Sequence, residues 1–332
     1  MEVELWGVMP TYKRPTQLVL TLAELAQQTR QLDHLVIVDN GGDMRSLLDS
    51  EIAHPKAARR VTLLSQDRNL GPAGALDVGL RHVLANARAD AWVATFDDDD
   101  PPRFPDVLQR LWESAQQTLM DDPRIGAIGV SGTRFESDRV RVRKLHNDEL
   151  TGRPVRVTAL GGNHVPMIRL AAVKEAGPHR AELFFGHEEL EFFLRVNQKG
   201  WSVYCDTAML RRYRKAKEGR TGQATVPSWR LGHADWRRYY SIRNRVYVAR
   251  EYAGLLPACR VVAEVTTKVL ANAVRSPRSA IQHARLTASA CLDGWVGRLG
   301  PTWTPDLTAD GRLPLNANKR KNRPSDSCGA DS

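Results

Sequence analysis

The sequence predicts an α/β fold in which a mostly parallel, Rossmann-like sheet is flanked by helices and followed by a helical C-terminal extension. Two observations support this. Short apolar runs alternate with longer helix-period segments through the first hundred residues, which is typical of βαβ units in a parallel sheet. The 332 residues, 42% hydrophobic and 26% charged, also have the composition of a globular chain that buries a sizeable core.

Local patterns place the elements of this first part. Each predicted strand is a short apolar run, and each predicted helix carries apolar residues at helical spacing, such as Leu18, Leu22 and Leu25 on one face. The predicted strands are residues 5–9, 34–38, 61–64 and 91–96. The predicted helices between them are residues 15–29 and 73–84.

The remaining chain continues the pattern and then becomes helical. We predict further strands at residues 125–131, 155–160 and 201–205, and a helix at residues 188–199. A helical region follows at residues 255–299, with Pro277 as a break. The predicted organisation is one α/β domain at residues 1–250, amphipathic helices at residues 251–300 and a loose tail at residues 301–332.

The charge distribution is uneven. The net charge is +10, and residues 201–260 carry 13 Lys and Arg against four Asp and Glu, so nearly the whole excess lies in this segment. Such a segment predicts a partner rich in anions, which could be nucleic acid, a membrane surface or a phosphorylated substrate. Charge alone does not choose among these three.

Cysteine spacing and the N-terminal residues indicate a cytoplasmic setting. The four cysteines show no paired spacing, so neither a disulfide framework nor a zinc site is predicted. The first residues lack the basic and apolar regions of a secretory signal. No run of 18 apolar residues occurs, so no membrane span is expected.

The most specific chemical feature is the run of four aspartates at residues 97–100, directly after a predicted strand. Ligands bind beyond the carboxyl ends of such strands, and adjacent carboxylates repel one another unless a cation or solvent screens them. Hard oxygen ligands without nearby Cys or His favour Mg²⁺ or Mn²⁺ over zinc. A solvated acidic turn is the alternative interpretation.

Five motifs together resemble family 2 glycosyltransferases. They occur in the order of that family over residues 4–250, and they are residues 11–15 (TYKRP), 37–40 (IVDN), 69–75 (NLGPAGA), 97–100 (DDDD) and 188–195 (EELEFFLR). Residues 236–245 and 292–298 are similar to segments of galactofuranosyl- and rhamnosyltransferase-like members. The resemblance implies a GT-A fold, with residues 1–250 as the nucleotide-sugar-binding and catalytic domain, and transfer that inverts the anomeric carbon.

The resemblance also implies a donor site. Thr11 and Tyr12 would line the nucleotide pocket, Asp39 would contact the base or ribose, and the turn after Arg68 and Asn69 would approach the diphosphate. A surface role for Arg68 is an open alternative. No GxGxxG follows the first strand, which argues against a dinucleotide enzyme. The remaining implied donor-binding residues are Arg14, Asp97, Asp98 and Gly162.

Family members hold the metal with an Asp-x-Asp pair, so the implied ligands are Asp97 and Asp99. The fourth carboxylate leaves the register open, because Asp98 and Asp100 have the same spacing. A third ligand would be His233, or else Arg211 or Arg212 would supply the charge, in a closing loop at residues 211–220.

A general base must take the proton of the acceptor hydroxyl. The resemblance places it in the acidic pair that opens a helix, and Glu189 fits that position. Glu188 and Glu191 are the alternatives, and acids that merely complement the helix dipole are a further one.

The predicted function is therefore an inverting, metal-assisted glycosyltransferase. Its donor would be a UDP- or dTDP-sugar, and its acceptor a glycan, a lipid-linked glycan or a natural product. The basic segment and the amphipathic helices allow peripheral contact with the inner face of the membrane. A nucleotidyltransferase is disfavoured because no Gly-rich basic loop follows the first strand. Nucleic-acid binding through residues 201–260 is disfavoured because no zinc, RRM or helix-turn-helix signature accompanies the charge.

Overall fold

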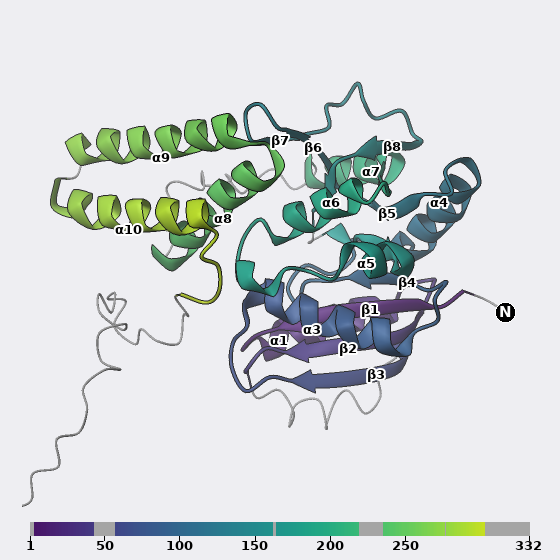
Figure 1. The fold of residues 1–332 in the computed structure, drawn as a ribbon. Coiled ribbons are helices and arrows are strands. Elements are labelled where there is room, and N and C mark those ends of the chain that lie inside the picture. Colours follow the sequence, from purple (N-terminus) through teal and green to yellow (C-terminus); the bar gives the residue numbers. More distant parts are fainter. Residues whose placement is uncertain (1–2, 43–56, 162–163, 219–234, 276, 303–332) are drawn as a thin grey trace, which may run out of the picture.

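The computed structural model describes residues 3–42, 57–161, 164–218, 235–275 and 277–302. Its larger sheet has the strand order β3-β2-β1-β4-β10-β5-β11-β8, and a smaller sheet has the order β7-β6-β9 (Figure 1). The strands are β1 (Leu5–Thr11), β2 (Leu32–Asp39), β3 (Ala58–Ser65), β4 (Trp92–Thr95), β5 (Ile125–Gly129), β6 (Gly132–Glu136), β7 (Arg141–Lys144), β8 (Pro154–Val157), β9 (Ala159–Leu160), β10 (Met167–Arg169) and β11 (Ser202–Asp206).

The predicted α/β class is confirmed. Strands β1, β2, β3 and β4 pair in parallel, as do β5 and β11. Strand β10 is antiparallel to its neighbours β4 and β5, and β8 is antiparallel to β11. The helices are α1 (Pro15–Ala26), α3 (Gly71–Asn86), α4 (Val107–Asp121), α5 (Leu170–Ala176), α6 (Glu188–Gln198), α7 (Thr207–Glu218), α8 (Asp235–Tyr252), α9 (Leu255–Arg275) and α10 (Pro277–Val296), with a short 3₁₀ turn η3 (Ala181–Leu183).

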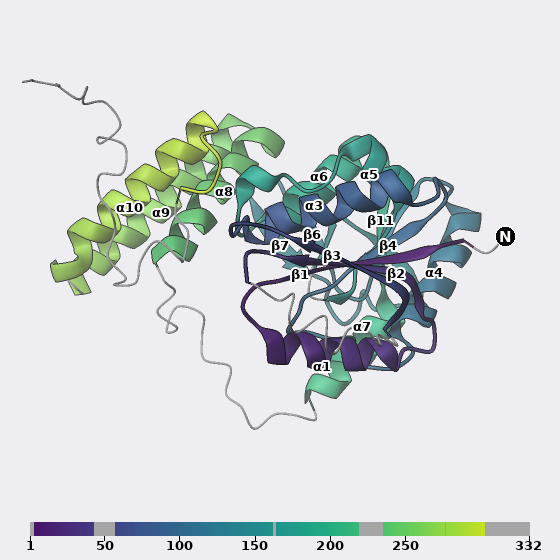
Figure 2. The same ribbon diagram turned by 90° about the horizontal axis from the view of Figure 1, so that it is seen from below.

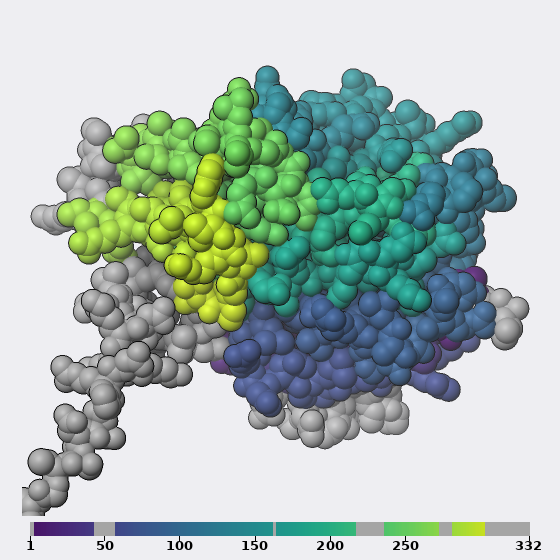
Figure 3. Space-filling model, viewed as in Figure 1, coloured from purple at the N-terminus to yellow at the C-terminus, as the bar shows by residue number. Residues whose placement is uncertain are grey.

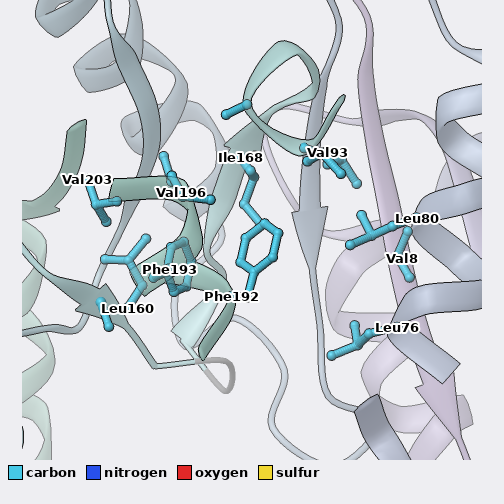
Figure 4. Close-up of a cluster of buried hydrophobic side chains, with 14 of the residues drawn as sticks. Val8, Leu76, Leu80, Val93, Leu160, Ile168, Phe192, Phe193, Val196 and Val203 are labelled. Carbon is cyan, nitrogen blue, oxygen red and sulfur yellow. The ribbon is translucent and has the colours of Figure 1, made fainter. Parts of the chain in front are cut away.

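Helices cover both faces of the larger sheet, and each face has its own core. Side chains alternate along β1, so Trp6 and Val8 face α3 while Leu5 and Met9 face α1. The first core contains α3, α5 and α6, with Phe192, Phe193 and Leu80 among its buried side chains (Figure 4). The second contains α1, α4 and α7 on the opposite face (Figure 2).

Helix α3 lies very close to the sheet because of Gly79. A Cβ atom at this position would come within 2.4 Å of Val8 Cγ1 and 3.2 Å of Val38 Cγ2. The absence of a side chain therefore lets the helix axis approach β1 and β2. The N-terminal end of α3 lies at the carboxyl edge of the sheet because the helix follows β3.

The C-terminal helices α8, α9 and α10 pack on one another and form an arm beside the sheet domain (Figures 1 and 3). The predicted helical region and its break near Pro277 are confirmed. No helix in the described part of the chain is long and apolar enough to cross a membrane.

Two local predictions are wrong. The strand expected at residues 155–160 divides at Thr158, because β8 pairs with β11 in the larger sheet whereas β9 pairs with β6 in the smaller one. The loop expected from residue 211 is helix α7 as far as residue 218, because Asp206 caps it by accepting a hydrogen bond from the Met209 N–H (2.9 Å). The predicted tail falls largely on residues 303–332, outside the described part of the chain.

The close approach at Gly79 gives a stability prediction. Gly79→Ala should lower the free energy of unfolding by about 1–3 kcal/mol, because the added methyl group overpacks the contact between α3 and β1. Urea denaturation measures this. Arg81→Ala on the exposed face of the same helix removes only an ion pair to Asp77 and is the control, with an expected change within about 0.5 kcal/mol. Equal effects of the two variants would contradict the prediction.

Candidate active site

A pocket of about 440 Å³ opens at the carboxyl ends of β1, β2 and β4. This is the edge at which α/β sheets bind ligands, and the volume suits a small molecule. The loop before α6 and the first turn of α8 form its other walls. The lining residues are Pro10, Thr11, Tyr12, Arg14, Asn40, Asn69, Gly71, Pro72, Leu76, Asp97, Asp98, Asp99, Phe184, Phe185, Glu188, Glu189, Trp236 and Arg237.

The acidic turn sends its side chains in different directions. Asp97 and Asp99 are exposed and line the pocket, whereas Asp98 is buried and accepts a hydrogen bond from the Thr11 hydroxyl (2.8 Å). Asp97 and Asp100 pair through their backbones, and the Asp100 carboxylate lies 3.5 Å from Nδ1 of His164. Asp97 and Asp99 are therefore the two residues of the acidic turn that line the pocket with exposed side chains, whereas Asp98 lines it with a buried one.

Asp97 has the most strongly shifted pKa of the acidic turn. Its side chain is exposed to the pocket, but the protein around it partly desolvates the carboxylate, and this effect, with the charges of Asp99, Asp98 and Asp100, raises the pKa of Asp97 to about 6. Burial also raises the pKa of Asp98, although its bonds to Thr11 and Arg14 oppose this. Arg14 is the nearby cation and forms ion pairs with both Asp98 (3.3 Å) and Asp99. The arginine thus neutralises part of the cluster from its outer side.

Two asparagines build the next wall of the pocket. Asn40, directly after β2, accepts a hydrogen bond from the Leu70 N–H (2.8 Å) and donates to Asn69 Oδ1 and to the Gly71 carbonyl (3.1 Å each). Asn69 Oδ1 also accepts from the Gly71 N–H (2.8 Å). These bonds hold the turn that begins α3. Asn40 was not among the predicted site residues, although it follows a strand at the ligand-binding edge.

Two predicted donor-site residues lie outside the pocket lining. Asp39 is 2% exposed, and its Oδ1 accepts a hydrogen bond from the Gly42 N–H (2.9 Å). Arg68 is exposed, and its backbone touches the turn at Gly41. Their predicted contacts with the donor stay predictions.

A strained loop leads into α6 and forms the wall opposite the acidic turn. Phe184, Gly186 and His187 all have left-handed backbone angles, with φ of 62°, 79° and 68°. The Phe184 carbonyl accepts a hydrogen bond from the Ala73 N–H (3.3 Å), and a Cβ atom at Gly71 would approach that oxygen to 2.2 Å. The loop therefore packs directly against the first turn of α3.

The three candidate glutamates differ in environment. Glu191 is completely buried and bonds to Arg180, Arg195 and Tyr252, and it does not line the pocket. Its environment is that of a structural ion pair. Glu188 and Glu189 both line the pocket, and Glu189 also borders a small adjoining cavity together with Asp97.

Glu188 is nearly as buried as Glu191, at 7% exposed, and in both residues Oε2 has no hydrogen-bond partner in the described part of the chain. Burial first, and then the charge of Asp97, raise the pKa of Glu188 to about 7. Glu189 is only partly buried. The pocket therefore contains one buried glutamate that resists ionisation, Glu188, beside a second, Glu189, that is more accessible from the pocket.

The cations proposed to complete the metal shell are placed elsewhere. Arg212 pairs with Asp106 (2.7 Å), and Arg211 donates to the Leu150 carbonyl, so the expectation that either would face the diphosphate is wrong for these conformations. His233 and Gly162 lie outside the described residues. Within the described chain, no group of three or more His, Cys, Asp or Glu side chains is arranged as a metal site.

The buried Glu188 gives a pH prediction for the metal-free protein. In the unfolded chain its carboxyl ionises near the ordinary value of 4.5, whereas in the folded chain the proton is held to about pH 7. The stability that it contributes is therefore present below pH 4.5 and lost as pH rises through 7. Glu188→Gln should be more stable than wild type by about 1–3 kcal/mol at pH 8, with a much smaller difference at pH 4.5. Urea midpoints at the two pH values measure this, and an equal gain at both would contradict it.

Comparison with known proteins identifies the domain that carries this pocket. Residues 8–171 match the profile of glycosyl transferase family 2. The galactofuranosyltransferase GlfT1 of Mycobacterium tuberculosis is 36% identical over 117 residues, which are 35% of this chain and 37% of that protein. The succinoglycan biosynthesis protein ExoO of Rhizobium meliloti is 36% identical over 91 residues, 27% of this chain and 23% of that protein. The matched segments thus span 37% of the first relative and 23% of the second.

A solved structure of GalNAc-T7 with UDP, GalNAc and Mn²⁺ shares the fold, with a TM-score of 0.50 and 15% identity over 62% of this chain and 43% of that one. The sheet order, the pocket at its carboxyl edge and the family match agree with one another. The chain therefore contains a family 2 glycosyltransferase domain with the GT-A fold.

Proposed function

We propose that this protein is an inverting glycosyltransferase that moves a sugar from a nucleotide-diphosphate sugar to a hydroxyl acceptor. One observation supports this above the others: Asp97 and Asp99 present carboxylates to the same pocket as Glu188 and Glu189. An anionic leaving group would sit on the first side, and proton removal would occur on the second. The family match and the names of the relatives agree with this assignment.

The chemistry of the acidic turn suits a divalent cation. Asp97 and Asp99 offer hard oxygen ligands. Burial first, and then the neighbouring carboxylates, raise the pKa of Asp97, and a bound cation would favour its ionised form. Mg²⁺ or Mn²⁺ held there would neutralise the departing diphosphate. A protein site with few ligands is appropriate, because substrate phosphates and water complete the shell of such ions. His233 remains a proposed further ligand.

The donor would lie along the ends of β1 and β2. Thr11, Tyr12 and Asp39 would contact the nucleoside, as predicted from the motifs, and Asn69 would hold the turn near the diphosphate. UDP and dTDP are the proposed nucleotides. Asp98 has a different role in this proposal, because its carboxylate is occupied by Thr11 and Arg14 and fixes the acidic turn to β1.

Glu189 is the proposed general base. In the transfer step its carboxylate takes the proton of the acceptor hydroxyl, the acceptor oxygen bonds to the anomeric carbon, and the bond from that carbon to the nucleotide diphosphate breaks. Attack opposite the leaving group inverts the configuration. Glu189 is favoured over Glu188 because it is the less buried of the two and therefore the more accessible to a substrate hydroxyl.

The acceptor would enter past an aromatic wall. Phe185 and Trp236 line the pocket with ring centroids 4.9 Å apart, and the Arg237 guanidinium lies 5.1 Å from the Trp236 ring. Aromatic faces and a cation suit a glycan acceptor, including one that carries a phosphate. Lipid-linked and natural-product acceptors are both compatible with this wall.

Activity with a donor panel tests the function. The purified protein with Mn²⁺ or Mg²⁺ should transfer or hydrolyse at least one of UDP-, dTDP- and GDP-sugars, with nucleotide-linked galactofuranose first because of the relatives' names. Glu189→Gln should lower kcat by at least about 100-fold while leaving donor binding intact, because it removes only the base. Asp99→Asn should weaken metal-dependent donor binding measured by calorimetry.

Arg81→Ala, at an exposed residue that does not line the pocket, serves as the matched control for both variants. No turnover of any donor by wild type would refute the proposed function. If wild type turns over a donor and Glu189→Gln remains fully active, only the assignment of Glu189 as the base is refuted.

Peripheral membrane contact is a second part of the proposal. The arm exposes large apolar side chains on α9 and α10, namely Leu255, Leu256, Leu270, Ile281, Leu292 and Val296. These would meet the interface of a membrane that presents a lipid-linked acceptor. Vesicles containing 30% phosphatidylglycerol should therefore retain the protein in a sedimentation assay at about 0.1 M salt, the ionic strength at which charges beyond ~10 Å are screened. Ile281→Ser with Leu292→Ser should reduce retention, and equal retention of this variant would contradict the assigned surface.

A further inference from the structure

Helix α8 carries two polar side chains that are completely buried, Arg243 and Asn244. Burial lowers the pKa of the Arg243 guanidinium, and among the described residues no carboxylate lies within ion-pair distance of it. The guanidinium instead lies 4.7 Å from the ring of Tyr240. A buried cation and a buried amide are costly, so their partners indicate what they are for.

Those partners are backbone carbonyls of the strained loop before α6. Arg243 donates to the carbonyls of Glu182 (3.1 Å) and Leu183 (2.8 Å). The Asn244 amide nitrogen lies within hydrogen-bond distance of three carbonyl oxygens of that loop, at 2.7–2.9 Å, those of Leu183, Phe185 and Gly186. Each of these carbonyls lies 58–61 positions before its donor in the sequence.

The two side chains act as one unit. Arg243 Nε donates to Asn244 Oδ1 (2.9 Å), which fixes the orientation of the amide so that its NH₂ group faces the loop. Arg243 also donates to the Gly300 carbonyl (2.7 Å), and the Gly300 N–H donates to Glu182. The segment that follows α10 is therefore bonded to the same loop, and the end of the arm lies against the sheet domain there (Figure 3).

The loop has a conformation that it would not keep unaided. Three of its residues are left-handed, two of them not glycine, and each such residue costs about 1–3 kcal/mol. The loop ends at His187, directly before Glu188 and Glu189, and contributes Phe184 and Phe185 to the pocket. Any relaxation of the loop would move the first turn of α6 relative to the acidic turn.

We propose that Arg243 and Asn244 are positioning residues that hold the Glu188–Glu189 end of α6 at its working distance from Asp97 and Asp99. They act through the loop carbonyls and touch no substrate. This inference rests on the proposed transfer reaction, and it assigns a catalytic purpose to the contact between the helical arm and the sheet domain. The arm is thus part of the active-site architecture.

The test compares Asn244→Ala and Arg243→Lys with Arg250→Lys. Arg250 is the matched control because it lies on the same helix and also donates to a carbonyl, that of Trp295, but does not touch the loop. Asn244→Ala should lower kcat by about 10–100-fold with less than a twofold change in donor affinity, because a misplaced base slows the chemistry and spares binding. Arg243→Lys keeps the positive charge but loses the planar guanidinium that donates to several carbonyls at once. We expect a smaller fall in kcat for this variant than for Asn244→Ala.

Hydrogen exchange gives a readout that does not depend on activity. In Asn244→Ala the amides of residues 183–187 should exchange at least about tenfold faster than in wild type, while those of α1 and the control variant remain unchanged. If wild type turns over no donor, the proposed reaction fails and exchange alone decides whether the loop is held by α8. Wild-type exchange and kcat in Asn244→Ala would overturn the inference. The inference would also be overturned if kcat and donor affinity of Asn244→Ala fell together, in proportion to a fall in its unfolding midpoint, because the variant would then only be less stable.

Discussion

Four carboxylates follow one another at residues 97–100, and the fold accommodates them by turning adjacent side chains to different partners. The constraint is Coulombic, since like charges in a partly enclosed site cannot all stay ionised without compensation. Asp98 turns inward to Thr11, Arg14 covers the outer side, and Asp100 faces His164. What remains exposed in the pocket is the pair Asp97 and Asp99, whose charge a divalent cation would compensate in the proposed reaction. The hydrogen bond between Asp98 and Thr11 also ties the acidic turn to β1.

The basic segment has a different explanation from the one that its charge suggests. Most described cations between residues 201 and 260 bind groups of the protein itself, such as Arg212 to Asp106 and Arg245 to Glu264. Several donate to backbone carbonyls, including Arg211, Arg214, Arg243 and Arg250. Arginine suits this use because its planar fork satisfies more than one acceptor. Much of the positive charge in this segment therefore joins elements of the fold and is not presented to an anionic partner, although Arg237 does line the pocket.

The sequence was sufficient for features with a local signature. Alternating apolar runs predicted the strands that pair in parallel, although not β6, β7 or β10, and the acidic run and the glutamate pair both line one pocket. Features that depend on distant partners were not predictable in this way. The break at Thr158 depends on which sheet each half joins, and the role of Asn40 depends on a turn 30 residues away. Arg243 and Asn244 look like any polar pair on a helix until their carbonyl partners are known.

The strained loop explains why a two-part architecture suits this chemistry. A base must be held close to the acceptor oxygen, and a helix N-terminus is a rigid support only if the residues before it are fixed. Left-handed residues at Phe184 and His187 make the loop short and sharply bent, which brings α6 to the pocket but leaves several carbonyls without partners in the loop itself. A buried carbonyl without a donor is costly, and side chains from α8 supply the donors. The bend and the helical arm are therefore interdependent: the loop needs the arm to satisfy its backbone, and the arm is anchored by satisfying it.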